Sequence, residues 1–173
     1  MKWSQIERTG RQNHKIHGII KKLYAFFDEF MKIEQAVTVP FSAAQMYELV
    51  NNAKDYPDFL PWCTKTEVVS QTDTEQEATL FISYLGFTQQ VTTRNNMIPD
   101  ERIDIHLVKG PFRKLDGFWQ FKPSGDSGCC IQFYMEYEFI NPLFFDMIAG
   151  SFFNQITHSL VEAFLTEAKK RFS

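Results

Sequence analysis

The stretch IQFYMEYEFINP, residues 131–142, decides the fold class of this chain. Its first nine residues alternate between strongly apolar and more polar positions, which is the pattern of a half-buried β-strand. The apolar face of this strand consists of Ile131, Phe133, Met135, Tyr137 and Phe139. Asn141 as N-cap and Pro142 in the first turn then begin a helix, which apolar residues at spacings of three and four continue to Lys170. A strand with one apolar face and a long helix after it predict a helix packed on an antiparallel sheet.

Upstream of this stretch the sequence predicts six more strands, separated by turn residues such as Gly86, Pro99-Asp100 and Gly110-Pro111. With the last strand at 129–140, the predicted strands span residues 32–39, 64–71, 76–85, 87–97, 102–109 and 113–122. Between the first two, Ser42 and Gln45 form a capping box for a helix that runs to Asn51. Pro57 and Pro61 bracket a second, very short helix.

These elements predict an α+β fold in which a curved antiparallel sheet wraps around the long C-terminal helix. Two short helices follow the first strand. The aromatic residues number 18 Phe, 6 Tyr and 3 Trp, and so many large rings indicate either a bulky core or a lined cavity. A sheet curved around a helix with aromatic side chains on both faces favours the cavity.

Composition excludes several classes of protein. The chain has 173 residues, 44% of them hydrophobic and 23% charged, which suits one globular domain and no disordered or fibrous protein. Three cysteines without ligand or pairing spacing exclude a disulfide framework and indicate a reducing compartment. The longest apolar run falls short of a membrane span. The net charge is −3, and residues 31–173 alone carry −6, which argues against binding nucleic acid, DNA included, through the overall field and leaves only a local basic patch for such binding.

Residues 1–30 differ from the rest of the chain. Apolar residues recur at helical spacing between Ile16 and Phe30, with Lys15, Lys21 and Lys22 among them. One interpretation is an amphipathic helix that contacts a membrane surface or a partner. The other, which we favour, is a mis-assigned start, because Met31 directly precedes a clean strand pattern. In either case the domain is expected to span residues 31–173.

Several separated strings resemble the START-like helix-grip superfamily, and within it the coenzyme-Q-binding and ribosome-association-toxin group. They are Val39-Pro40-Phe41-Ser42, Gln45-Met46-Tyr47, Asn51, Tyr56-Pro57, Phe59-Leu60-Pro61-Trp62-Cys63, Thr92-Thr93-Arg94-Asn95 and Gly110-Pro111-Phe112 with Leu115, Gly117, Trp119 and Phe121. Members of this group typically begin near the position of Met31. Trp62 differs from the group, in which a small residue is expected at this position of the loop.

The resemblance implies two functions. The first is a non-enzymatic protein that holds ubiquinone or a related isoprenoid quinone in a hydrophobic cavity and supports respiratory electron transfer. The alternative is a toxin-like protein that binds the large ribosomal subunit, blocks subunit joining and so inhibits translation initiation. We expect a cytoplasmic protein with peripheral contact to the inner membrane, and no required cofactor besides the bound quinone.

Three sets of residues are candidates for the site, each with core packing or a solvated turn as the alternative. The predicted lipid-binding residues are Phe81, Phe87, Val91, Ile105, Leu107, Trp119, Phe133, Met135, Phe145, Phe152 and Ile156. The predicted lip of the cavity consists of Phe59, Leu60 and Trp62. A basic turn around an exposed Pro-Phe pair, for a membrane or ribosomal RNA, consists of Lys109, Pro111, Phe112, Arg113 and Lys114.

The sequence supports catalysis weakly. His106 and Asp104 share a strand face, but no nucleophile, metal-ligand set or phosphate-binding loop accompanies them. Arg94 is expected to form an ion pair with an acid such as Glu136 or to bind a polar headgroup. We therefore expect no enzyme, and aromatase/cyclase activity ranks third among the functions.

Overall fold

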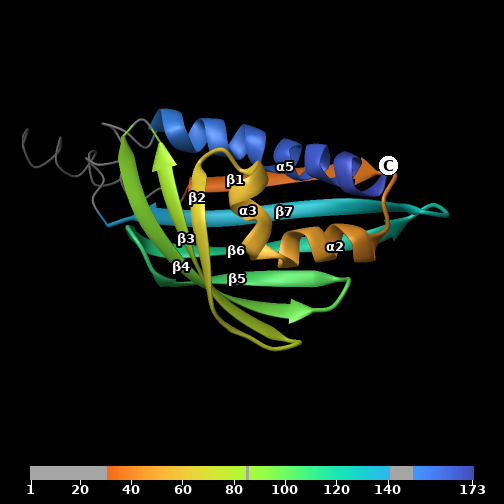
Figure 1. Cartoon of the computed structure of the whole chain (residues 1–173), viewed down its shortest axis with the longest axis horizontal. Helices are drawn as coiled ribbons and strands as arrows, with labels where there is room; N and C mark the ends of the chain where they lie inside the picture. The colour runs from red at the N-terminus through yellow and green to blue at the C-terminus, as the bar shows by residue number, and fades with distance from the viewer. Residues whose placement is uncertain (1–30, 85, 141–149) are drawn as a thin grey trace, which may run out of the picture. The chain divides into compact units, whose positions relative to one another are not determined.

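The computed structural model describes residues 31–84, 86–140 and 150–173. Its strands form one antiparallel sheet (Figure 1). They are β1 (Met31–Val39), β2 (Cys63–Gln71), β3 (Glu75–Tyr84), β4 (Phe87–Ile98), β5 (Arg102–Lys109), β6 (Phe112–Ser124) and β7 (Gly128–Phe139). Each predicted strand is confirmed, with boundaries that differ from the prediction by at most two residues.

The strand order is β1-β7-β6-β5-β4-β3-β2, so β2 to β7 form a meander and the first strand adds to the last. Val37 pairs with Ile131 in that closing ladder. The chain therefore crosses from one edge of the sheet to the other between β1 and β2. That crossing carries α2 (Ala43–Asn51), the 3-10 turn η1 (Ala53–Asp55) and α3 (Tyr56–Phe59).

Local chemistry explains where the crossing helices begin. The backbone N–H of Gln45 donates to Ser42 Oγ at 3.2 Å, and the backbone N–H of Ser42 donates to Gln45 Oε1 at 2.9 Å. This is the predicted capping box, and it satisfies two backbone donors at the start of α2. Pro57 lies in the first turn of α3, where a missing N–H costs nothing.

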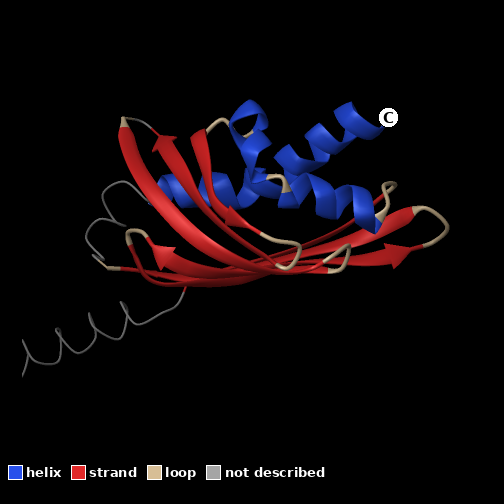
Figure 2. Ribbon diagram, turned by 60° about the horizontal axis from the view of Figure 1, so that its bottom comes forward, coloured by secondary structure: helices blue, strands red, loops and turns tan. Residues whose placement is uncertain are grey.

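The helices cover one face of the curved sheet (Figure 2). The longest is α5 (Gly150–Phe172), which confirms the predicted C-terminal helix over that range. The predicted start of that helix at Asn141 lies outside the described residues, as does the segment 1–30. Among the described residues, no helix is long and apolar enough to cross a membrane.

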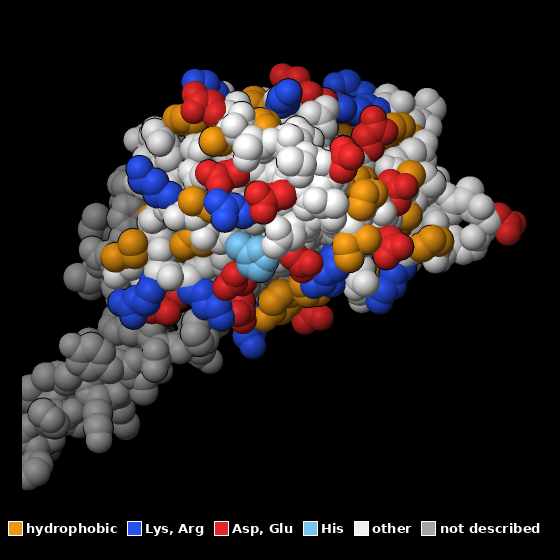
Figure 3. Space-filling model, turned by 90° about the horizontal axis from the view of Figure 1, so that it is seen from below, with side chains coloured by type: hydrophobic (Ala, Val, Ile, Leu, Met, Phe, Trp, Pro, Cys, Tyr) orange, Lys and Arg blue, Asp and Glu red, His pale blue; other side chains and the backbone are white. Residues whose placement is uncertain are grey.

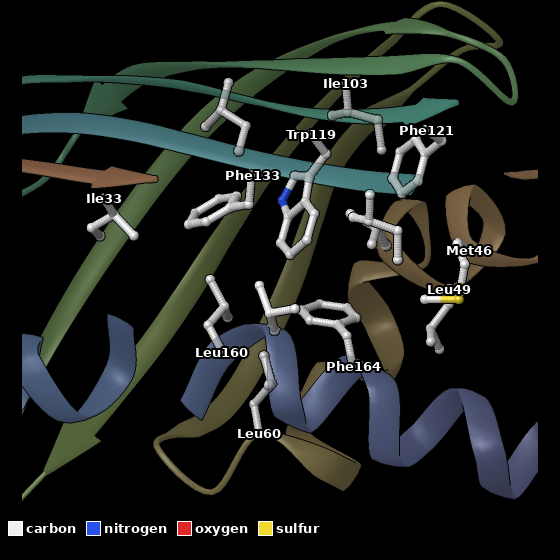
Figure 4. Packing of buried hydrophobic residues seen from close by; sticks show 14 of the residues in the cluster. Ile33, Met46, Leu49, Leu60, Ile103, Trp119, Phe121, Phe133, Leu160 and Phe164 are labelled. Atoms are coloured by element: carbon white, nitrogen blue, oxygen red, sulfur yellow. The ribbon is translucent and has the colours of Figure 1, made fainter. Parts of the chain in front are cut away.

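The core lies between α5 and the concave face of the sheet. Trp119 of β6 points towards Phe164 of α5, and their ring centroids are 5.2 Å apart (Figure 4). Phe133 of the neighbouring strand lies beside Trp119, with centroids 4.4 Å apart. These rings are at least 96% buried, so they tie the helix to the middle of the sheet. The predicted curved sheet around a long helix, with two short helices after the first strand, is confirmed.

Candidate functional site: an apolar cavity under the long helix

A cavity of about 150 Å³ lies between the sheet and α5. Its walls come from every strand except β2, from the crossing between β1 and β2, and from α5. The lining residues are Ile33, Ala53, Tyr56, Leu60, Trp62, Gln76, Ala78, Leu80, Ile82, Val91, Thr93, Asn95, Ile105, Phe112, Leu115, Trp119, Phe133, Met135, Ile156, Leu160 and Phe164.

Two periodicities bring this lining together. Alternate residues of β4, Val91, Thr93 and Asn95, face the cavity because successive side chains of a strand point to opposite faces. On α5 the lining residues are Ile156, Leu160 and Phe164, at spacings of four on one side of the helix. Alternate side chains of the strand therefore face every fourth side chain of α5 across the cavity.

The lining is almost entirely apolar, which determines what can bind. In the described part of the chain it includes no acidic, basic, histidine or cysteine side chain. An apolar cavity of about 150 Å³ in another protein binds benzene. This cavity is therefore of the size for one ring or a short branched chain, and it favours such groups through the burial of apolar surface.

Six of the eleven predicted lipid-binding residues lie in this lining: Val91, Ile105, Trp119, Phe133, Met135 and Ile156. Phe81 does not, because its neighbours Leu80 and Ile82 face the cavity while its own ring lies under the ammonium of Lys65. Leu107 packs against the core without lining the cavity. Phe145 and the side chains of Phe87 and Phe152 lie outside the described residues.

The predicted lip is divided by the structure. Leu60 and Trp62 line the cavity, and Leu60 is only 1% exposed. The ring of Phe59 instead packs edge-on against Tyr56 and Phe164, with centroids 5.9 and 5.1 Å apart. This end of the crossing is therefore held by aromatic contacts with α5.

The prediction of an exposed Phe112 was wrong. Its side chain is 5% exposed, lines the cavity and packs on Phe139 with centroids 4.7 Å apart. The basic residues after it are paired across the sheet: Arg113 contacts Glu138 at 2.6 Å, and Lys114 contacts Glu136. Lys109 is exposed and Pro111 partly so. The turn is less basic than its sequence indicates, since two of its cations have anionic partners.

The outer face of the sheet carries paired charges. The ammonium of Lys114 and the hydroxyl of Tyr134 both donate to Glu136, and the lysine contact is the main reason that the pKa of this carboxyl falls. Arg94 forms the expected ion pair, but its partner is Glu77 on the adjacent strand, at 2.8 Å, and not Glu136. Figure 3 shows acidic and basic side chains side by side on one face of the molecule.

His106 and Asp104, the pair that the sequence suggested as a base and its orienting acid, each pair with another residue. The partner of His106 is Asp116 and not Asp104: His106 Nδ1 lies 3.1 Å from Asp116 Oδ1, and both side chains are about half exposed. Asp104 pairs with Arg102 at 2.7 Å. Within residues 31–84, 86–140 and 150–173, no group of three or more His, Cys, Asp or Glu side chains could hold a metal ion.

Sequence reasoning missed the polar part of the cavity wall. Gln76, Thr93 and Asn95 line it, together with Tyr56, whose hydroxyl donates to the carbonyl of Val50 at 2.5 Å. Burial raises the pKa of the Tyr56 hydroxyl. The signal for Thr93 and Asn95 was present, because they share the strand face of Val91, which was a predicted lining residue.

Comparisons with known proteins give the chain its relatives. The family described as polyketide cyclase / dehydrase and lipid transport matches residues 39–165. The ribosome association toxin RatA of Escherichia coli (strain K12) is 37% identical over 142 residues, covering 82% of this chain and 89% of that protein. The mitochondrial coenzyme Q-binding protein COQ10 homolog B of Xenopus laevis is 27% identical over 143 residues, covering 80% of this chain and 58% of that protein.

Among solved structures, the Zhui aromatase/cyclase from Streptomyces sp. R1128 matches with a TM-score of 0.75. The match covers 84% of this chain and 97% of the enzyme, at 17% sequence identity. At that identity the likeness shows the fold alone.

Proposed function

We propose that this chain, which belongs to the polyketide cyclase / dehydrase and lipid transport family, binds an isoprenoid quinone in the cavity beneath α5. The expected family resemblance is confirmed by the matches to RatA and to the coenzyme Q-binding protein. The proposal is of a binding protein without catalytic action on the ligand, which it shields from water in support of electron transfer.

The apolar cavity is the observation that carries this proposal. Burial of a quinone ring or of an isoprene unit against Trp119, Phe133 and Leu160 removes apolar surface from water, worth roughly 25 cal/mol per Å². A volume of about 150 Å³ cannot enclose a long polyisoprenoid tail. The bound molecule would place one end in the cavity while the remaining tail extends from it, in the cytoplasm or against the inner membrane.

A titration with a short-chain quinone tests the proposal. Two of the three tryptophans, Trp62 and Trp119, line the cavity, so a bound quinone should quench their fluorescence. Ubiquinone with a single isoprene unit should quench with saturation and raise the melting temperature, since binding to the folded state alone stabilises it. Quenching that grows without saturation, with an unchanged melting temperature, would count against binding in the cavity.

A second function is favoured by the 37% identity to the ribosome association toxin. In this proposal the protein associates with the large ribosomal subunit and inhibits translation initiation. Its basic contacts would come from the exposed Lys109 and from the end of α5, where Lys169 and Lys170 are exposed, whereas Arg171 is paired with Asp55 and Glu167.

Co-sedimentation with purified large subunits separates the two functions. Association through basic residues should weaken steeply as salt rises, because it releases counterions from RNA. Lys109→Glu, at the end of β5, should reduce sedimentation. Lys122→Glu, near the C-terminal end of β6, serves as a control of equal charge change. Failure to sediment at low salt would reject this second function and leave quinone binding untouched.

A further inference from the structure

The side chain of Asn95 is poorly explained by the fold alone. It lies on β4 and lines the cavity, with Thr93 on the same strand face and Gln76 directly opposite on β3. Its Oδ1 atom is buried and finds no hydrogen-bond partner among the described residues. Buried side-chain oxygens are nearly always hydrogen-bonded, so an unpaired one needs an explanation.

The surroundings of Asn95 are fixed rather than loose. The opposite residue, Gln76, is 1% exposed, and its Nε2 donates to the backbone carbonyl of Asn51 at 3.0 Å. This bond ties β3 to the end of α2, next to the lining residue Ala53. The end of the cavity between β3 and β4 is therefore a built polar corner in an apolar wall.

A polar group here costs stability in the free protein. An apolar side chain of similar shape would fill the position without leaving an acceptor unpaired, and such a replacement is often neutral or stabilising. Residues that lower the stability of the fold in this way are typically found at functional sites. The missing partner of Asn95 Oδ1 is a hydrogen-bond donor, and the cavity in front of it is where a ligand would supply one.

A second buried polar atom among the lining residues is also unpaired. The indole Nε1–H of Trp62 finds no acceptor in the described part of the chain. Trp62 precedes Cys63, which pairs with Ile82, while Asn95 pairs with Gln76 six residues earlier on β3. The cavity thus offers an acceptor and a donor at separate positions along its length.

We propose that the corner formed by Gln76, Thr93 and Asn95 is a hydroxyl-binding subsite, which takes an apolar alcohol, phenol or hydroquinone. The ligand hydroxyl donates to Asn95 Oδ1, and a second ligand oxygen accepts from the indole N–H of Trp62. This rests on the proposed function and adds to it the orientation of the ligand, with its oxygen-bearing ring inside. A reduced quinone supplies the required hydroxyl, whereas an oxidised quinone has only acceptors.

A pair of probes of nearly the same shape tests the subsite: 4-butylphenol and butylbenzene, titrated calorimetrically into the full chain. In Asn95→Leu, the Kd for 4-butylphenol should rise about tenfold, which corresponds to one lost hydrogen bond to a buried acceptor. The Kd for butylbenzene should stay the same or fall. Asn96→Leu is the matched control, because Asn96 is the exposed next residue on the same strand.

The melting temperature of the ligand-free protein gives a second readout. If Oδ1 is unpaired, Asn95→Leu should leave this temperature unchanged or raise it, and Asn95→Val offers a replacement suited to a strand should Leu fail to fold. An equal change in Kd for both probes would overturn the proposed subsite. An unchanged Kd for 4-butylphenol would also overturn it, and is the result expected if a water molecule donates the hydrogen bond to Asn95 Oδ1. If the wild type binds butylbenzene but the subsite test fails, the proposed cavity binding stands. If it binds neither probe, both proposals fall.

Discussion

Arg171 and Asp55 lie 116 positions apart in the sequence, yet Arg171 Nη1 donates to Asp55 Oδ2 at 2.7 Å. The same guanidinium donates through Nε to Glu167 at 2.7 Å. Asp55 also accepts from Asn52 Nδ2 at 2.9 Å. The last turn of α5 is thereby joined to the crossing segment that contributes Ala53, Tyr56, Leu60 and Trp62 to the cavity.

Removal of this connection should destabilise the domain. In Arg171→Met the carboxylate of Glu167, a residue 6% exposed, loses its main partner and stays buried. We expect the free energy of unfolding to fall by about 1–3 kcal/mol, as for other buried groups left unpaired. Urea unfolding measures the change. Lys169→Met, at an exposed position two residues earlier, is the control, and equal losses in both variants would contradict a specific role for Arg171.

The same contact predicts how stability depends on pH. The hydrogen bond from Arg171 holds the pKa of Glu167 below its ordinary value. Since the unfolded chain then binds a proton more readily than the native one, this carboxylate stabilises the fold above about pH 4.3, the usual value for Glu. That contribution is lost as the pH falls through the lower, native pKa.

Glu167→Gln tests this dependence. Its deficit in unfolding free energy relative to the wild type should be full at pH 7 and should shrink as the pH drops below about 4. Denaturant titrations at pH 7, 5, 4 and 3 measure that deficit. A deficit of the same size at every pH would show that charge on Glu167 contributes nothing.

Gly117 should be sensitive to the smallest substitution. A Cβ at this position would lie 2.4 Å from the carbonyl oxygen of Tyr134 on β7, so the two backbones must separate. Gly117→Ala should therefore cost roughly 1–3 kcal/mol through strain in the β6–β7 ladder. Gly110→Ala is the comparison, because a Cβ there meets its nearest atoms at an ordinary 3.5 Å. Similar melting temperatures for the two variants would contradict the close approach.

Phe112 should act through stability and not through contact with a partner. Its ring packs on Phe139 and lines the cavity, so Phe112→Ala should lose about 3–5 kcal/mol of unfolding free energy. Lys109→Ala, at an exposed position, should change it by less than about 0.5 kcal/mol. Wild-type stability of Phe112→Ala would contradict the burial of this ring.

The sequence predicted the elements because each was specified locally. The capping box of Ser42 and Gln45, the prolines around α3 and the turn residues between strands act over a few positions. The helix over sheet arrangement then followed from one apolar face on each element. These are the features for which short-range pattern and tertiary packing agree.

Side-chain direction was harder to predict where a strand is apolar on both faces. The run Leu80-Phe81-Ile82 is apolar throughout, so the sequence does not show which of these side chains face the core. Phe81 lies on the face opposite to the prediction. In the turn after Gly110-Pro111, the neighbouring cations Arg113 and Lys114 suggested that Phe112 is exposed at the tip of a hairpin. The pairing of Phe112 with Phe139 instead turns that ring inward. Such pairings depend on register between distant strands.

The quinone content of the purified protein tests the central claim most directly. Wild type, Val91→Phe and Val69→Phe would be isolated from a quinone-producing host, extracted with organic solvent and analysed by mass spectrometry. Val91 lines the cavity, whereas Val69 is 61% exposed on β2, so the same substitution fills the cavity in one variant only. We predict an isoprenoid quinone in the wild type and in Val69→Phe, and a loss of at least about tenfold in Val91→Phe. Quinone retained equally in folded Val91→Phe, or absent from all three proteins, would contradict the claim that this cavity is a quinone-binding site.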